Sequence, residues 1–244
     1  MALARKLLSL ITSSPFHLFF PPLCLHCDEK IESHKNPLCP ACLKELILLD
    51  PLGKCLHCFT HLEDNKPLCD NCFQNPAPYK RAASVFDYQG PASSLIKALK
   101  YQSRTDYAKD VAAFMVMQLE NLKWPLPDII IPVPQTTLRK IERGFNQSAL
   151  IANHLAQMLN IETLEVLKRK SGGFSQSSLS KAQREELSKD LFYCREQTDL
   201  SGKIALLIDD VLTTSTTLRC CAAALKEVFP KSIYVLTFCH AEKY

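Results

Sequence analysis

Residues 204–218 decide the fold, and they read Ile-Ala-Leu-Leu-Ile-Asp-Asp-Val-Leu-Thr-Thr-Ser-Thr-Thr-Leu. The apolar run from Ile204 to Ile208 predicts a strand buried on both faces, as strands of parallel sheets are. Two carboxylates and a run of hydroxyl groups follow, where the chain is expected to turn into a helix from Thr214 to Val228. The segment therefore predicts a strand-to-helix turn of an α/β sheet.

Strands and helices alternate on both sides of this segment. Apolar or alternating runs predict strands at residues 83–88, 128–131 and 232–238, and helical periodicity predicts helices at residues 92–101, 106–122 and 146–159. This order predicts an α/β domain, with a mostly parallel sheet flanked by helices.

Ligands of such sheets bind beyond the carboxyl ends of the strands, which here means after Ile131 and Ile208. Asp209 and Asp210 can hold sugar hydroxyls and an associated metal, while hydroxyl groups at a helix N-terminus can hold a phosphate. The pattern predicts a phosphosugar site. A helix cap with two solvated aspartates is the simpler alternative, but it accounts for one hydroxyl and not for the whole run.

Cysteines form a second pattern, because eight of the 12 fall within residues 24–72. They make four Cys-x-x-Cys pairs: Cys24/Cys27, Cys39/Cys42, Cys55/Cys58 and Cys69/Cys72. Leu-His-Cys and Pro-Leu-Cys each occur twice, so the unit is duplicated. Four thiolates in a closed shell are typical of structural zinc, which predicts two zinc ions. Sequential pairing is favoured, although a cross-braced arrangement of Cys24/Cys27 with Cys55/Cys58 fits the spacing too.

Two histidines, His26 and His57, lie inside these cysteine knuckles. A complete set of four thiolates leaves them without a role as ligands, and we expect them to face solvent.

Composition is that of a globular protein, with 244 residues, 47% hydrophobic and 22% charged. The net charge of +4 excludes a protein that is basic over its whole surface. The stretch Gln-Asn-Pro-Ala-Pro at residues 74–78 predicts a boundary between a double zinc ribbon with a short N-terminal helix, residues 1–78, and the α/β domain, residues 79–244. Paired cysteines without a membrane-length apolar run favour a cytoplasmic protein.

Residues 204–218 resemble the 5-phosphoribosyl 1-diphosphate (PRPP) motif of type I phosphoribosyltransferases. Other segments resemble the ComF (competence protein F) family in order: the four knuckles, Tyr88 to Pro91 with Leu99 to Tyr101, Pro132 to Pro134, Arg143 to Gln147, and Gln176 to Leu179. The resemblance runs from about Pro22 to near the end of the chain. It implies a type I phosphoribosyltransferase-like domain behind the zinc ribbons.

By this resemblance, Asp209 and Asp210 bind the ribose hydroxyls of PRPP, and magnesium accompanies its diphosphate. The 5-phosphate is expected to bind Thr213, Thr214, Ser215, Thr216 and Thr217, and the diphosphate-binding loop corresponds to Val133, Pro134 and Gln135. Arg143 belongs to a matching segment and suits a leaving diphosphate. Asp209, Asp210 and Arg143 are therefore the candidate catalytic residues.

Ser215 departs from the family pattern, which normally has glycine at this position. Glycine lets backbone N–H groups approach a phosphate and tolerates a positive φ, whereas serine adds a Cβ and a hydroxyl group. The substitution puts catalytic activity in more doubt than the fold.

Three functions stay open. The resemblance implies a PRPP-binding protein linked to uptake or handling of single-stranded DNA in natural transformation, with a DNA-uptake helicase or other competence proteins as partners. An active phosphoribosyltransferase of nucleotide metabolism is the second, and it needs an acceptor pocket that the sequence does not reveal. A non-catalytic PRPP sensor or nucleic-acid-binding zinc-ribbon module is the third. The basic stretch at residues 168–178, beginning Lys168-Arg169-Lys170, suits either an anion-site loop or contact with a nucleic-acid backbone.

Overall fold

The computed structural model describes residues 21–32, 36–63, 66–102, 104–170 and 191–241. The chain divides into two units, residues 1–47 and residues 48–244. This division places the second cysteine group, Cys55 to Cys72, in the unit that contains the sheet. The short N-terminal helix expected before residue 20 lies outside the described residues, and the domain boundary expected at residue 78 stays a prediction.

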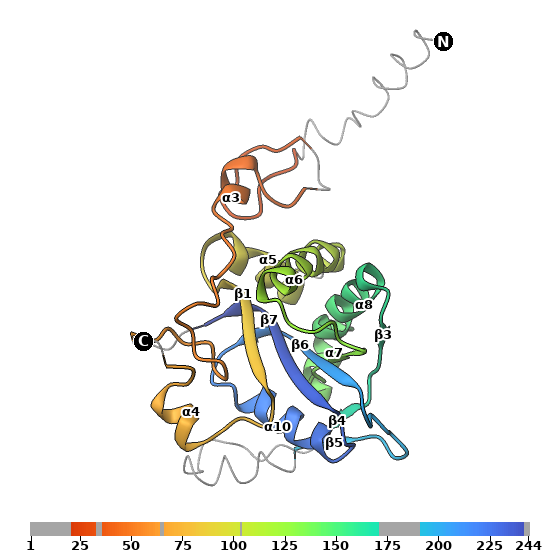
Figure 1. Cartoon of the computed structure of the whole chain (residues 1–244). Helices are drawn as coiled ribbons and strands as arrows, with labels where there is room; N and C mark the ends of the chain where they lie inside the picture. The colour runs from red at the N-terminus through yellow and green to blue at the C-terminus, as the bar shows by residue number, and fades with distance from the viewer. Residues whose placement is uncertain (1–20, 33–35, 64–65, 103, 171–190, 242–244) are drawn as a thin grey trace, which may run out of the picture. The chain divides into compact units, whose positions relative to one another are not determined.

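The sheet has five strands in the order β1-β7-β6-β2-β3, and every neighbouring pair is parallel (Figure 1). Its strands are β1 (Arg81–Asp87), β2 (Ile129–Pro132), β3 (Glu162–Thr163), β6 (Ile204–Leu212) and β7 (Ser232–His240). A two-stranded antiparallel ribbon, β4 (Leu167–Arg169) with β5 (Phe192–Cys194), stands apart from it. The predicted mostly parallel α/β sheet is confirmed.

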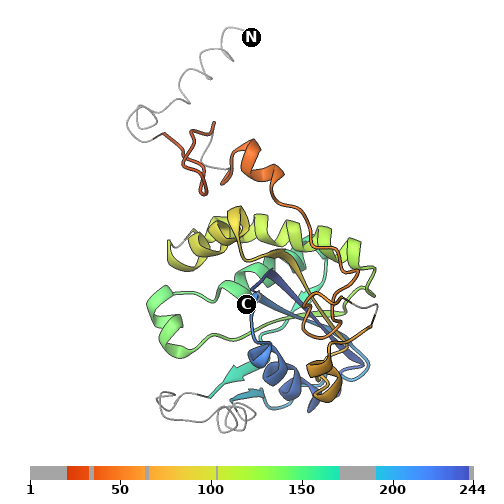
Figure 2. The ribbon, with the colours of Figure 1, turned by 90° about the vertical axis from the view of Figure 1, so that its left-hand side faces the viewer.

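Helices cover both faces of this sheet, which explains why its central strands are mostly apolar. They are α5 (Gly90–Tyr101), η1 (Thr105–Tyr107), α6 (Ala108–Leu122), α7 (Thr137–Arg143), α8 (Gln147–Leu159) and α10 (Thr216–Lys226). Figure 2 shows α5 and α6 on one side of the sheet and α10 on the other. Ile129, Ile130 and Ile131 are fully buried between these layers, where each contributes about 1.5–3 kcal/mol of burial free energy.

Strand β6 is longer than the apolar run predicted. It continues through the acidic pair to Leu212, in register with β7, and α10 starts at Thr216 rather than at Thr214. Asp209 and Asp210 therefore lie inside the strand, near its carboxyl end, and not in the turn that follows it.

The two cysteine groups repeat one local structure, each within its own unit. In the first, Cys24 N–H donates to the Glu29 carbonyl at 2.7 Å, and helix α3 (Pro40–Lys44) begins inside the second knuckle, with Cys39 at its N-cap. In the second, Cys55 N–H donates to the Thr60 carbonyl at 2.9 Å, and helix α4 (Asp70–Gln74) likewise begins inside its second knuckle, with Cys69 at its N-cap. The sequence repeat is thus a structural repeat.

Across the described ranges, no helix has both the length and the apolar character needed to cross a membrane.

Candidate functional site

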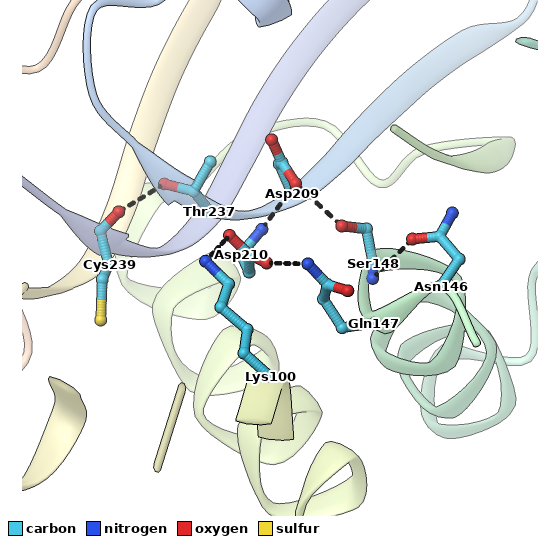
Figure 3. Close-up of polar contacts among 8 residues, drawn as sticks. All are labelled: Lys100, Asn146, Gln147, Ser148, Asp209, Asp210, Thr237 and Cys239. Atoms are coloured by element: carbon cyan, nitrogen blue, oxygen red, sulfur yellow. Dashed lines mark hydrogen bonds and ion pairs between the residues drawn. The ribbon is translucent and has the colours of Figure 1, made fainter. Parts of the chain in front are cut away.

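The centre of the candidate site is Asp210 on β6, whose residue is only 5% exposed. Lys100 at the end of α5 places its Nζ 2.7 Å from Asp210 Oδ1, and Gln147 Nε2 at the start of α8 donates to Oδ2 at 2.6 Å (Figure 3). A buried carboxylate is stable only when it is paired and hydrogen-bonded. Helices α5 and α8 supply both of these partners.

Asp209 is held by a different set of donors. Ser148 Oγ donates to its Oδ1 at 2.8 Å, and the backbone N–H of Asp210 donates to the same oxygen at 2.9 Å. Burial and the charge of Asp210 raise the pKa of Asp209 and the Ser148 hydrogen bond lowers it, so that this pKa is about 7. Near neutral pH the pair therefore carries less negative charge than two free carboxylates would.

Three successive residues at the N-terminus of α8 join this pair to the loop after β2. Asn146 caps the helix, because its Oδ1 accepts from Ser148 N–H at 3.1 Å, while its Nδ2 donates to the Val133 carbonyl at 3.0 Å. Gln147 and Ser148 then contact the two aspartates. The segment that starts at Arg143 thus supplies the residues that hydrogen-bond to both aspartates and to the loop after β2.

The expected diphosphate loop lies beside this helix start. Val133 is buried and its N–H donates to the Ile208 carbonyl of β6 at 2.9 Å, and Pro134 follows it. Oriented to satisfy its neighbours, the Gln135 amide donates to the Phe145 carbonyl and accepts from Gln147 N–H, both at 3.1 Å. The structure therefore brings Val133 and Gln135 to the segment that binds the aspartates.

The hydroxyl-rich turn begins α10. Thr213, Thr214 and Thr217 are exposed, Thr216 is half-buried, and Thr214 Oγ1 lies 3.2 Å from Thr216 Oγ1. Ser215 is buried and adopts a left-handed backbone with φ 59° and ψ −6°. This is a conformation that glycine adopts freely and serine does not. The geometry thus explains why glycine would suit this position and shows that serine adopts a left-handed backbone here.

Arg143 ends α7, and its guanidinium carbon lies 5.3 Å from the ring centre of Tyr101. Its Nη1 is buried and has no hydrogen-bond acceptor among the described residues. A buried guanidinium donor without an acceptor is rare, and it suits an anionic oxygen supplied by a ligand.

The eight knuckle cysteines form two groups of four, Cys24, Cys27, Cys39 and Cys42, and Cys55, Cys58, Cys69 and Cys72. Within each group the sulfurs lie within 4.8 Å of one another, and the Sγ atoms of Cys27 and Cys39 and of Cys58 and Cys69 are each 3.7 Å apart. Tetrahedral zinc with Zn–S bonds of about 2.3 Å separates its sulfurs by about 3.8 Å. The grouping is sequential rather than cross-braced, and each set can hold a zinc ion.

His57 does not lie as the sequence suggested. It is partly buried, its Nδ1 accepts from the Ala77 N–H at 3.3 Å, and its ring meets that of Tyr79 edge-on. The expectation that it faces solvent is wrong, because the knuckle packs on the segment leading to β1. His26 is exposed, as expected.

The basic stretch is described only in part. Lys168 and Arg169 belong to β4, and the Arg169 guanidinium stacks on Phe192 at 5.3 Å. Residues 171–178 of this stretch, with Gln176 to Leu179 of the resemblance, lie outside the described residues.

Sequence reasoning missed two partners of the aspartates, Lys100 and Ser148, and gave Gln147 no individual role. Lys100 and Gln147 stood inside segments that carried the family resemblance, which was a signal for their importance. Ser148 follows such a segment, and nothing local in the sequence distinguished it from an ordinary helix residue.

Comparison with known proteins shows similarities along most of the chain. Residues 146–244 match the model of the phosphoribosyl transferase domain. The chain is 28% identical to competence protein F of Haemophilus influenzae over 223 residues, which cover 89% of this chain and 96% of that protein. It is also 28% identical to the DNA utilization protein YhgH of Escherichia coli, over 91% of this chain and 98% of the other.

Other similarities are weaker. Competence protein ComFC of Bacillus subtilis is 24% identical over 84% of this chain and 78% of its own. Among solved structures the likeness is weak: a glutamine PRPP amidotransferase from B. subtilis has a TM-score of 0.41 and 20% identity, over 58% of this chain and 30% of that one. The chain is thus similar to competence and DNA utilization proteins over most of its length, its residues 146–244 match the phosphoribosyl transferase domain, and its two four-cysteine groups fit a double zinc ribbon.

Proposed function

We propose that the chain binds PRPP together with Mg²⁺ at the carboxyl end of β6. The observation that carries this proposal is the acidic pair, held by Lys100, Gln147 and Ser148 just before the hydroxyl-rich start of α10. Asp209 and Asp210 suit the ribose hydroxyls, and the N-terminus of α10 suits the 5-phosphate.

The remaining groups fit the other end of the ligand. The unpaired Nη1 of Arg143 offers a charge-assisted hydrogen bond to the diphosphate. Carboxylate and phosphate oxygens are the ligands that Mg²⁺ prefers, so the metal would be bound between the ligand's diphosphate and the acidic pair. Magnesium would neutralise part of the charge of the diphosphate, and the chain's own residues would orient the sugar.

Calorimetric titration with PRPP and Mg²⁺ tests the proposal. We expect saturable binding by the intact chain and at least a tenfold loss in Asp209→Asn/Asp210→Asn. The exposed aspartates of Asp106→Asn/Asp199→Asn provide a control with the same charge change. Equal binding by both double variants would contradict the assignment. Release of diphosphate from the same samples distinguishes phosphoribosyl transfer from binding alone.

A second function is favoured by a separate surface. Lys80, Lys226 and Lys231 line one hollow of about 430 Å³, and none of its nine lining residues is acidic. It lies where β1 and β7 begin, at the opposite end of these parallel strands from the acidic pair. Phe229 next to it is 74% exposed and held at φ 54°, a strained conformation for an aromatic residue.

Ammonium groups and an exposed ring suit single-stranded DNA, through phosphate contacts and base stacking. We therefore propose that this surface handles DNA, in line with the names of the relatives. A DNA-uptake helicase or other competence proteins as partners rest on those names alone, and a cytoplasmic location rests on the reduced thiols that zinc binding needs.

Fluorescence anisotropy with an oligonucleotide tests the DNA surface. Lys226→Ala/Lys231→Ala should weaken binding and lower the salt slope by about 1.4, which corresponds to two phosphate contacts. Lys97→Ala/Lys109→Ala changes the charge equally on other helices and should leave the slope unchanged. Identical effects of the two pairs would refute the location.

A further inference from the structure

The segment between the second cysteine group and β1 lies against the start of α10 (Figures 1 and 2). Arg219, in the first turns of α10, donates through Nη2 to the carbonyls of Asn75 at 2.9 Å and Pro76 at 3.0 Å. The N–H of the same residue donates to the Ser215 carbonyl at 2.8 Å. One residue thus joins the turn expected to bind phosphate to the segment that follows α4.

Tyr79 makes a second connection, and it reaches the cysteine knuckle itself. Its residue is 4% exposed, and its hydroxyl donates to the His57 carbonyl at 2.8 Å, between Cys55 and Cys58. Burial raises the pKa of Tyr79 above its ordinary range, whereas the charge of Arg219 and a hydrogen bond with Ser215 act against this rise. The phenol therefore lies between the knuckle and the residue held at positive φ.

The knuckle is also fixed to the sheet. Ala82 N–H of β1 donates to the Leu56 carbonyl at 2.7 Å, and the Phe59 ring meets the His240 ring of β7 edge-on at 6.2 Å. Small cysteine-rich segments owe most of their order to the bound metal. An ordered knuckle therefore holds the Tyr79 hydroxyl in place, and with it the segment at residues 75–79.

We propose that Tyr79 and Arg219 are positioning residues that hold the phosphate-binding turn, Thr213 to Thr217, against the second cysteine group, so that metal binding by this group sets the affinity for the phosphate end of PRPP. The proposal rests on the proposed PRPP site. A left-handed serine is a strained conformation that persists only when its surroundings fix it, and these contacts provide that fixation.

The first cysteine group is the natural control, because it belongs to the other unit of the chain. The sequence repeat has an offset of 30 or 31 residues, and the positions that correspond to Tyr79 are Leu48 and Leu49, which carry no hydroxyl group. The two groups have the same ligand set, so only their surroundings distinguish them.

Calorimetry on the full chain, with zinc content measured, compares Tyr79→Phe, Cys58→Ser and Cys27→Ser. Loss of one buried hydrogen bond predicts that Tyr79→Phe binds PRPP about threefold to tenfold more weakly. Cys58→Ser should weaken binding at least as much, and Cys27→Ser should not change it. In the variants that weaken PRPP binding, the affinity for ribose 5-phosphate should fall by the same factor as that for PRPP, whereas the affinity for magnesium diphosphate should not change. A general loss of structure would instead weaken the binding of ribose 5-phosphate and of magnesium diphosphate alike.

Hydrogen exchange of residues 213–219 without ligand separates this inference from the PRPP assignment. Faster exchange in Tyr79→Phe and Cys58→Ser, but not in Cys27→Ser, supports the contact even if the intact chain fails to bind PRPP, which would refute the proposed function alone. Unchanged exchange in Tyr79→Phe, or equal changes in both cysteine variants, would overturn the inference. Tyr79→Phe decides the question if Cys58→Ser does not fold.

Discussion

Replacing Ser215 by glycine and by alanine separates backbone strain from side-chain contacts. Both variants lose the hydroxyl group and its interaction with Tyr79, so this loss cancels when the two are compared. They differ only in the Cβ, at a residue with φ 59° and ψ −6°. The comparison therefore measures what a left-handed backbone costs at the start of α10.

The magnitude follows from two opposing contributions. A Cβ in the left-handed region costs about 1–2 kcal/mol, whereas glycine loses about 0.5–1 kcal/mol more conformational entropy on folding. Ser215→Gly should therefore unfold with a free energy about 0.5–1 kcal/mol higher than Ser215→Ala. At a residue with negative φ the order is reversed, since alanine there is the more stable by about 0.4–1 kcal/mol.

Urea unfolding at equal zinc content measures the difference. Ser94 in the middle of α5 provides the matched control. There Ser94→Ala should be more stable than Ser94→Gly by about 1 kcal/mol. If Ser215→Ala were as stable as Ser215→Gly, the turn would not hold a left-handed residue in solution, and the reason given for glycine at this position would fail.

Three other predictions concern the acidic pair and Arg143. Burial and Asp210 raise the pKa of Asp209 to about 7, so the folded state keeps a proton that the unfolded state loses near pH 4. The free energy of unfolding should therefore fall as the pH rises from 4 to 7. PRPP affinity should rise with pH up to about 7, because the ligand site needs the ionised carboxyl. Asp209→Asn should remove both dependences that belong to this carboxyl, leaving only that of the ligand's phosphates, and titrations between pH 5.5 and 8.5 check this. Lys100→Met leaves Asp210 buried without its ion pair and should cost about 3–5 kcal/mol in urea unfolding, of which Lys100→Met/Asp210→Asn recovers a large part; independent effects in this double-mutant cycle would contradict the pairing. Arg143→Met removes a donor that has no acceptor among the described residues, so stability should change by less than about 1 kcal/mol, whereas PRPP affinity falls at least tenfold and ribose 5-phosphate affinity is kept.

The sheet was predictable because its signals are local. An apolar run such as Ile204 to Ile208 indicates a strand buried on both faces, and alternation of strands with helices indicates a parallel sheet. The pairing of two thiols within each Cys-x-x-Cys turn followed equally from spacing, whereas spacing left both sequential and cross-braced grouping open, and the structure shows the sequential one. None of these features depends on which distant residues come together.

The partners of the carboxylates were not predictable in this way. Lys100 and Asp210 are far apart in sequence, and their ion pair forms because α5 ends next to β6 in the folded chain (Figure 3). The extension of β6 through two aspartates also goes against strand propensity, which disfavours aspartate. Pairing with β7 over the whole length of β6 outweighs that local preference.

The arrangement explains how two carboxylates can lie beside the polyanionic ligand that we propose. Lys100 balances the charge of Asp210, and burial leaves Asp209 close to half protonated at neutral pH. The acidic pair with Lys100 therefore carries less negative charge than two free carboxylates before a ligand arrives. Mg²⁺ binding would favour loss of the remaining proton, since a nearby cation stabilises the carboxylate. The full charge of Asp209 would then appear only together with the cation that balances it.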